Sequence, residues 1–116
     1  MPSSRNVLSY RNLSLTNTLI GVKEGASRIY GWIVNNENAS EVFVQFHDAA
    51  TTGDVTLGSD TPDLAVKVAN DGTDKMMPSS KDAYVDFDNG LVIAATTEEA
   101  NSTAPATAVS VTIFYK

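Results

Sequence analysis

The sequence predicts an all-β protein, a two-sheet antiparallel sandwich with jelly-roll or Greek-key topology. Apolar and polar residues alternate with period two in several short segments, which is typical of half-buried strands. Long runs of Leu, Glu, Lys and Arg, the usual material of surface helices, are missing. Because a single sheet would leave one apolar face in water, we expect seven or eight strands packed as two sheets.

The beginning of the chain is expected to differ from the rest. Residues 1–10 contain Pro2, Ser3 and Ser4 and only a brief apolar patch, so we predict an N-terminal arm that becomes ordered on contact with a neighbour. Residues 11–116 are expected to form a single β-sandwich domain, because separate cores rarely form in a chain of 116 residues.

Strands are predicted from the alternating segments in order along the chain. We expect them at 12–22, 27–35, 41–48, 63–68, 84–87, 91–96 and 107–116. Turn-forming residues at 35–40 favour an antiparallel hairpin between the second and third of these strands. Asn89 and Gly90 predict a type I′ turn between 84–87 and 91–96, and the apolar segment 91–96 is expected to be buried on both faces. Residues 70–74 are interpreted as a turn and 98–104 as a polar loop.

Charge and composition exclude several classes of function. The net charge of −6 and the scattering of the eight basic residues argue against a nucleic-acid partner. No segment approaches 18 consecutive apolar residues, and the first residues lack the apolar run of a signal peptide, so no membrane association is expected. The absence of cysteine excludes disulfides and favours synthesis inside the cell.

Catalysis is not expected either. His47 is the single histidine, no cysteine occurs and no Gly-x-Ser-x-Gly elbow is present, so we interpret His47 as a sheet-face residue hydrogen-bonded to its neighbours. We therefore assign no catalytic, cofactor-binding or metal-ligating residue. Two alternatives stay open: a calcium site of the non-EF-hand kind at loop carboxylates, and glycosylation at the sequons of Asn12, Asn38 and Asn101, which we interpret as chance matches.

Two aromatic residues are the strongest surface candidates. Alternation places Tyr30 and Trp32 on one strand face, where they could form a sugar-stacking platform or an interface anchor. We favour the interpretation that Trp32 fills the core, and keep both residues as interface candidates.

Several stretches resemble small virion proteins of tailed bacteriophages, the jelly-roll head-decoration or cement type. These stretches are 28–36, 42–48, 55–58 with Thr61 and Pro62, 88–97 and 102–105, all followed by the terminal strand. The resemblance covers about residues 26 to 116. It implies a non-enzymatic protein, made in the host cytoplasm, that sits on the capsid surface and stabilises the shell by binding the major capsid protein. It also implies a homo-oligomer, often a trimer at local three-fold axes, and no cofactor.

Contacts with the capsid or with sister copies are expected from the arm, the polar loops and strand edges, which offer backbone for β-augmentation. The interface candidates are Pro2, Ser3, Ser4, Arg5, Asn6, Val7, Leu8, Tyr10, Tyr30 and Trp32. The alternative function is a phage tail or fibre component, or a host-glycan-binding β-sandwich module.

Overall fold

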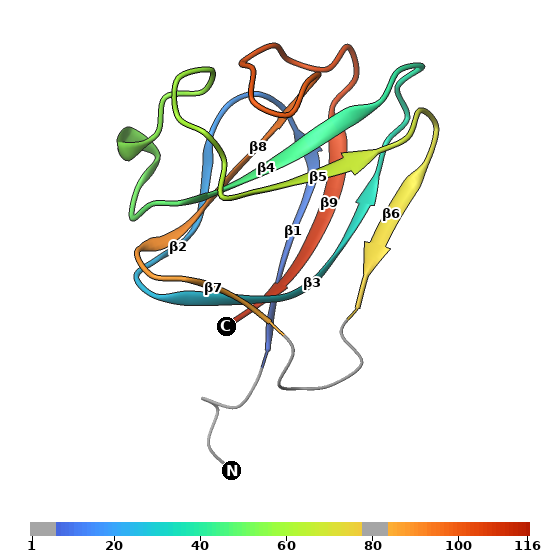
Figure 1. The fold of residues 1–116 in the computed structure, drawn as a ribbon. Coiled ribbons are helices and arrows are strands. Elements are labelled where there is room, and N and C mark those ends of the chain that lie inside the picture. Colours follow the sequence, from blue (N-terminus) through green and yellow to red (C-terminus); the bar gives the residue numbers. More distant parts are fainter. Residues whose placement is uncertain (1–6, 78–83) are drawn as a thin grey trace.

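The computed structural model describes residues 7–77 and 84–116, and these residues form two antiparallel sheets packed face to face (Figure 1). Sheet A contains, in spatial order, β1 (Leu8–Leu15), β9 (Val109–Tyr115), β3 (Ser27–Asn35) and β6 (Thr73–Met76). A further strand, β7 (Val85–Phe87), pairs with the first part of β3. Sheet B contains β2 (Ile20–Glu24), β8 (Gly90–Thr96), β4 (Val42–Asp48) and β5 (Leu64–Val68). The predicted all-β sandwich is confirmed.

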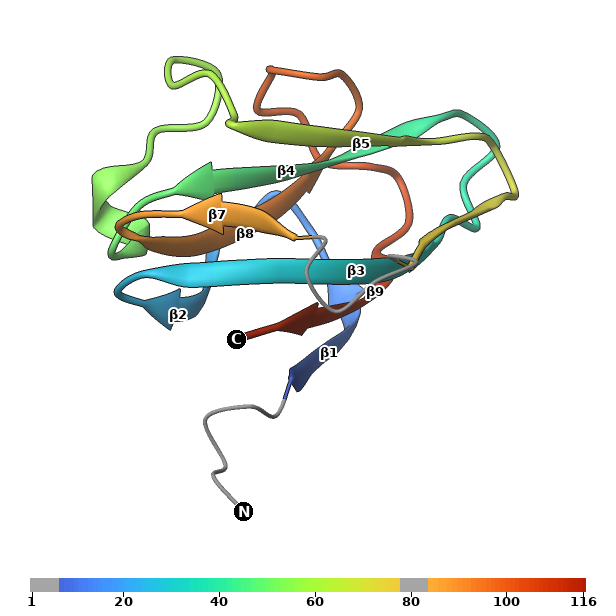
Figure 2. The same ribbon diagram turned by 60° about the horizontal axis from the view of Figure 1, so that its bottom comes forward.

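The order of pairing is that of a jelly roll. β4 pairs with β5, β3 with β6 and β7, β2 with β8, and β1 with β9, every pair being antiparallel. These pairs are the successive segments of one long two-stranded ribbon that folds over on itself, so consecutive early strands alternate between the two sheets (Figure 2).

The core lies between the inner faces of the two sheets. Val109, Val111 and Ile113 of β9 are fully buried at alternating positions, as the sequence predicts for this strand. Trp32 from sheet A meets Phe46 from sheet B, with ring centroids 5.7 Å apart. All residues of β8 are buried, which confirms the prediction for 91–96: Leu91, Ile93 and Ala95 face the core, and Val92 packs on the other side against Ala49, Val55 and Leu19.

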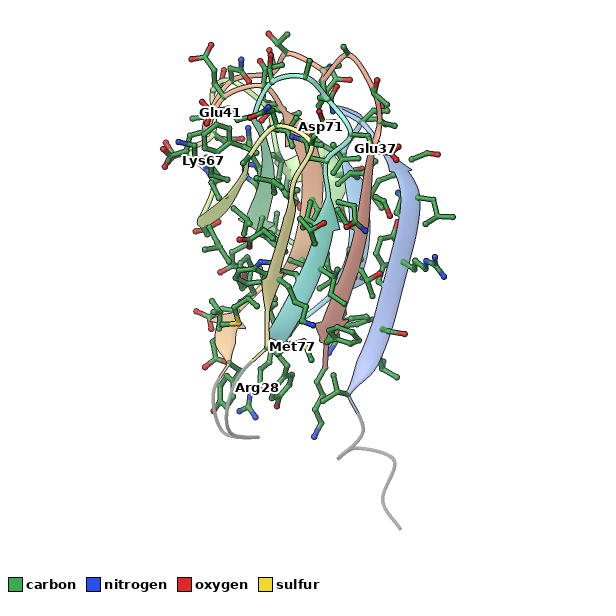
Figure 3. The ribbon with its side chains drawn as sticks, turned by 90° about the vertical axis from the view of Figure 1, so that its right-hand side faces the viewer. Arg28, Glu37, Glu41, Lys67, Asp71 and Met77 are labelled. Carbon is green, nitrogen blue, oxygen red and sulfur yellow. The ribbon has the colours of Figure 1, made fainter. Side chains whose placement is uncertain are left out.

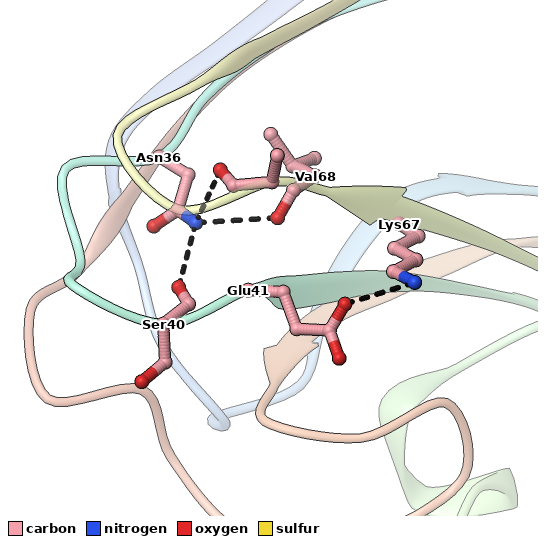
Figure 4. A network of polar contacts seen from close by, with 6 residues as sticks. Asn36, Ser40, Glu41, Lys67 and Val68 are labelled. Carbon is pink, nitrogen blue, oxygen red and sulfur yellow. Dashed lines mark hydrogen bonds and ion pairs between the residues drawn. The ribbon is translucent and has the colours of Figure 1, made fainter.

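The predicted hairpin between the strands at 27–35 and 41–48 is wrong, since β3 lies in sheet A and β4 in sheet B. Both strands present a large apolar face, and packing these faces against each other buries both. The connection is shaped by Asn36, which is buried and donates from Nδ2 to the carbonyl oxygens of Ser40 (3.0 Å) and Ala69 (3.0 Å), with that of Val68 at 3.3 Å (Figure 4). Beside it, Lys67 of β5 forms an exposed ion pair with Glu41 at 3.0 Å.

The predicted type I′ turn at Asn89 and Gly90 is also wrong, because β7 pairs in sheet A and β8 in sheet B. Within the described residues Gly90 has φ of 155°, and Asp71 is the only non-glycine residue with positive φ. Gly90 is needed for space rather than for a turn: a Cβ atom there would lie 2.4 Å from the carbonyl oxygen of Ala49.

The boundary of the predicted arm needs correction. β1 begins at Leu8 and pairs along its length with β9, so Leu8, Ser9 and Tyr10 belong to the sandwich, whereas residues 1–6 lie outside the described part. The strand predicted at 12–22 is two strands, β1 and β2, in different sheets. Residues 73 and 74, predicted as a turn, begin β6.

Helical structure in the described ranges is limited to a 3-10 turn at Thr52–Asp54. Residues 7–77 and 84–116 contain no helix of the length and apolar character needed to cross a membrane.

Candidate interaction surface

A β-bulge separates the two aromatic interface candidates. The register between β3 and β9 shifts between Ile29 and Gly31, so alternation restarts and Ile29 and Trp32 both face the core. Trp32 is 7% exposed and donates from Nε1 to Asp74 Oδ2 at 2.8 Å. The core interpretation of Trp32 is confirmed, and its ring offers no sugar platform. The expectation that Tyr30 and Trp32 share a face is wrong.

Tyr30 lies outside the core, half-buried, in a small aromatic cluster. Its ring centroid is 5.6 Å from that of Tyr84, with the ring planes tilted by 57°. The Arg28 guanidinium lies 4.4 Å above the Tyr84 ring, and Arg28 Nε donates to Asp86 Oδ1 at 3.2 Å. Because the two rings are tilted and one is covered by a cation, they do not make a flat stacking surface.

The N-terminal candidates divide at the start of β1. Pro2, Ser3, Ser4, Arg5 and Asn6 lie outside the described residues. Val7 and Leu8 are exposed to 45% and 53%. Tyr10 is half-buried against the core and its hydroxyl accepts a hydrogen bond from Asn12 Nδ2 at 3.2 Å.

Exposed apolar side chains gather at one end of sheet A. The described residues include six large hydrophobic side chains that are exposed, and five of them lie where β1 begins, where β6 ends and where β7 begins. We call these five the apolar end: Val7, Leu8, Met76, Met77 and Tyr84. Figure 3 shows Met77 and Arg28 at this end of the sheet. Clustered apolar exposure of this kind marks interaction surfaces more often than scattered single residues do.

The outer face of sheet A also has a distinct charge. Directly opposed residues of neighbouring antiparallel strands share a face, so the register defines rows across it. One row is Arg11, Thr112, Ile33 and Lys75, and the next row towards the loops is Ser110, Asn35 and Thr73. Arg28 and Asp86 form a further row at the apolar end.

We call Arg11, Arg28 and Lys75 the basic band. Within the described rows Asp86, which pairs with Arg28, is the single carboxylate on the same face, although the whole chain has a net charge of −6. A hollow of about 490 Å³ lies at the other end of the same face, lined by residues that include Leu13, Asn35, Thr73 and Ser110. Its margin carries Glu37 and Asp71, which we call the acidic rim (Figure 3).

Gly31 lets the end of β6 approach this face. A Cβ atom at Gly31 would lie 2.4 Å from the Met76 carbonyl oxygen and 3.3 Å from Met77 Sδ. The missing side chain is therefore what allows the backbone at Met76 and the side chain of Met77 to lie over β3.

His47 is placed as predicted, buried and hydrogen-bonded on sheet B. Its Nε2 lies 2.8 Å from Gln45 Oε1. Gln45 Nε2 donates to the Asn101 carbonyl oxygen (3.0 Å) and to Thr96 Oγ1 (2.9 Å), so Oε1 is an acceptor and His47 donates to it from Nε2. Burial lowers the pKa of His47, and the nearby carboxylates of Asp63 and Asp60 oppose that shift.

Two alternatives from the sequence analysis, a calcium site at loop carboxylates and glycosylation at the sequons, can be compared with the structure. Within residues 7–77 and 84–116 no group of three or more His, Cys, Asp or Glu side chains is arranged to hold a metal ion. Asn38 is 5% exposed and donates from Nδ2 to the Thr107 carbonyl oxygen at 2.9 Å, so its amide is occupied within the fold.

No protein-family model, no curated protein and no solved structure matches this chain.

Sequence reasoning missed the basic band, the acidic rim and the apolar end as surfaces. Alternation assigns the polar face of each strand, but the neighbours of that face depend on strand order, which a single sequence does not supply.

Proposed function

We propose that this protein is a structural protein of a bacteriophage virion, which decorates the head and stabilises the shell by binding the major capsid protein. The resemblance to jelly-roll cement proteins supports this function, and so does the jelly-roll strand order. On this proposal the protein is made in the host cytoplasm and acts on the capsid surface as a homo-oligomer, for which the resemblance implies a trimer.

The observation that carries the proposal is the apolar end. Monomeric proteins rarely gather exposed apolar side chains unless a partner covers them. Here five such side chains lie at one end of sheet A, where β6 ends and where β7 and β1 begin, and the segment that leads into β1 is the part of the sequence expected to contact neighbours. A weak contact through a few apolar side chains becomes firm attachment when it is repeated over a symmetric shell.

A binding measurement on shells assembled from the major capsid protein of the same genome tests the proposal. We expect fluorescently labelled protein to bind such shells saturably and to raise their resistance to heat. Replacing Val7 and Met77 by serine should weaken binding at least tenfold, because both side chains lose apolar area that the shell would cover. The matched control is Leu57→Ser, in the loop beside sheet B, which should bind like the unmodified protein.

Removal of residues 1–6 tests the arm separately. The deletion ends before Leu8, so that β1 keeps its pairing with β9. We expect the truncated protein to fold with an unchanged circular dichroism spectrum and to occupy fewer shell sites. Binding of the protein to tails and not to shells, seen by immunogold labelling of particles, would contradict head decoration and favour the tail or fibre alternative.

A further inference from the structure

The outer face of sheet A carries positive side chains near one end and negative side chains near the other. We propose that this face pairs with the same face of a second copy about a two-fold axis. The row that contains Arg11 and Lys75 lies towards the apolar end. Glu37 and Asp71 lie at the opposite end of the face, around the hollow. A surface with both signs at separate positions is complementary to itself when one copy is turned end over end.

The register fixes where the axis lies. Along β6 and the turn before it, Lys75 and Asp71 are each two residues away from Thr73. An axis along the row of Ser110, Asn35 and Thr73 therefore places Lys75 of each copy over Asp71 of the other copy. The symmetry makes this contact twice, so the pairing closes and no free binding face of the same kind is left.

The hollow supplies room for the partner's side chains. It has a volume of about 490 Å³, and Leu13 lines it together with the acidic rim. Long basic side chains bury their apolar stems while the charged group stays near water or a carboxylate. Arg11 and Lys75 of the second copy fit this description, because the stem of Arg11 would lie over Leu13 and the charge of Lys75 would meet Asp71.

The expected interface is small. Four strands spaced about 4.8 Å apart and an overlap of about five to six residues give a paired area of roughly 350 Å² per copy. A typical stable interface covers about 800 Å² per partner. The dimer should therefore be weak and sensitive to salt, since exposed charges are screened over about 8 Å at physiological ionic strength. The pairing leaves the apolar end uncovered, and it differs from the trimer that the resemblance implies.

Charge-swap variants test this pairing with the isolated protein. Arg11→Glu with Lys75→Glu makes the face acidic. Glu37→Lys with Asp71→Asn makes it basic, and asparagine is chosen because Asp71 has φ of 49°, which asparagine tolerates. Sedimentation velocity from 20 μM to 1 mM should show a monomer–dimer equilibrium for the unmodified protein in about 20 mM salt, at least tenfold weaker in about 500 mM salt.

Each variant alone should stay monomeric, and an equimolar mixture of the two should dimerise again. The matched controls change the net charge equally elsewhere: Lys23→Glu with Lys67→Glu, and Glu98→Lys with Glu99→Gln. Both controls should dimerise like the unmodified protein, and circular dichroism should be the same for all.

Three results with the protein alone, and a fourth with DNA, would overturn the proposal. The first three are an unmodified protein that stays monomeric at 1 mM in low salt, a mixture that does not recover dimers, and a trimer as the smallest oligomer. Basic-band-dependent binding of a single-stranded DNA 20-mer would also overturn it, because the face would then serve a nucleic acid. The measurement involves no capsid, so its outcome does not depend on whether head decoration is correct.

Discussion

Replacing Gln45 by leucine tests whether the buried polar network on sheet B holds the loop after β8 in place. Gln45 is fully buried, and its side chain joins His47, Thr96 and the carbonyl oxygen of Asn101 by three hydrogen bonds of 2.8 to 3.0 Å. Leucine has a similar volume, so the substitution removes the hydrogen bonds without leaving a large cavity.

The expected loss of stability follows from these contacts. Three net hydrogen bonds contribute about 3 kcal/mol, and the stranded His47 N–H and Asn101 carbonyl add about 1 kcal/mol each. Burying a leucine in place of an amide returns about 2 kcal/mol. The free energy of unfolding should therefore fall by about 3 kcal/mol, which corresponds to a Tm about 12 °C lower.

Urea unfolding followed by fluorescence measures this change, since Trp32 is the single tryptophan and is buried. Thr112→Val, a polar-to-apolar change on the outer face of sheet A, serves as control and should shift stability by less than about 0.5 kcal/mol. A double-mutant cycle with His47→Leu should show coupling, because both substitutions remove the same hydrogen bond. A loss below about 1 kcal/mol for Gln45→Leu, or additive effects in the cycle, would refute the role assigned to the network.

Two further predictions concern pH and backbone packing. Because burial lowers the pKa of His47, the unfolded chain binds a proton more readily near pH 6.5, so stability should decrease as the pH falls from about 7 to 5. Urea unfolding across this range checks the slope, and His47→Gln should flatten it; equal slopes in the two proteins would contradict the assignment. Gly31→Ala should destabilise by about 2 kcal/mol, because its methyl group meets the Met76 carbonyl oxygen, whereas Gly21→Ala, whose nearest contact would be 3.9 Å away, should change the Tm little. Equal Tm values for the two alanine variants would contradict this prediction, because β6 would then move away from the new methyl group with no loss of stability.

The fold class was predictable because period-two alternation survives in most strands. β5 has Leu64, Val66 and Val68 inward as expected, and β9 begins and ends within two residues of the prediction. Strand pairing was not predictable from local signals. The turn-forming residues after β3 suggested a hairpin, but Asn36 and Asn38 use their amides to hold a connection that crosses between the sheets.

The candidate surfaces were less predictable than the fold. The bulge in β3 adds one residue between Ile29 and Gly31, and this shift separates Trp32, which fills the core as we favoured, from Tyr30, which lies outside it. Arg11 and Lys75 are 64 positions apart in the sequence and fall in one row only because β1, β9, β3 and β6 lie side by side. A single sequence contains the alternation of each strand but not this order.

The pairing of β1 with β9 has a consequence for how the molecule is made. About a hundred residues separate the two strands, so β1 pairs with β9 only after all the segments between them have been synthesised. Contacts between distant segments slow folding, and the edge of β3 that pairs with β9 also stays open until β9 has been made. Translation that stops before Val109 would leave the edges of β1 and β3 unpaired on the nascent chain, and we expect such fragments to aggregate or be degraded, so that quality control in the producing cell acts on the synthesis of β9.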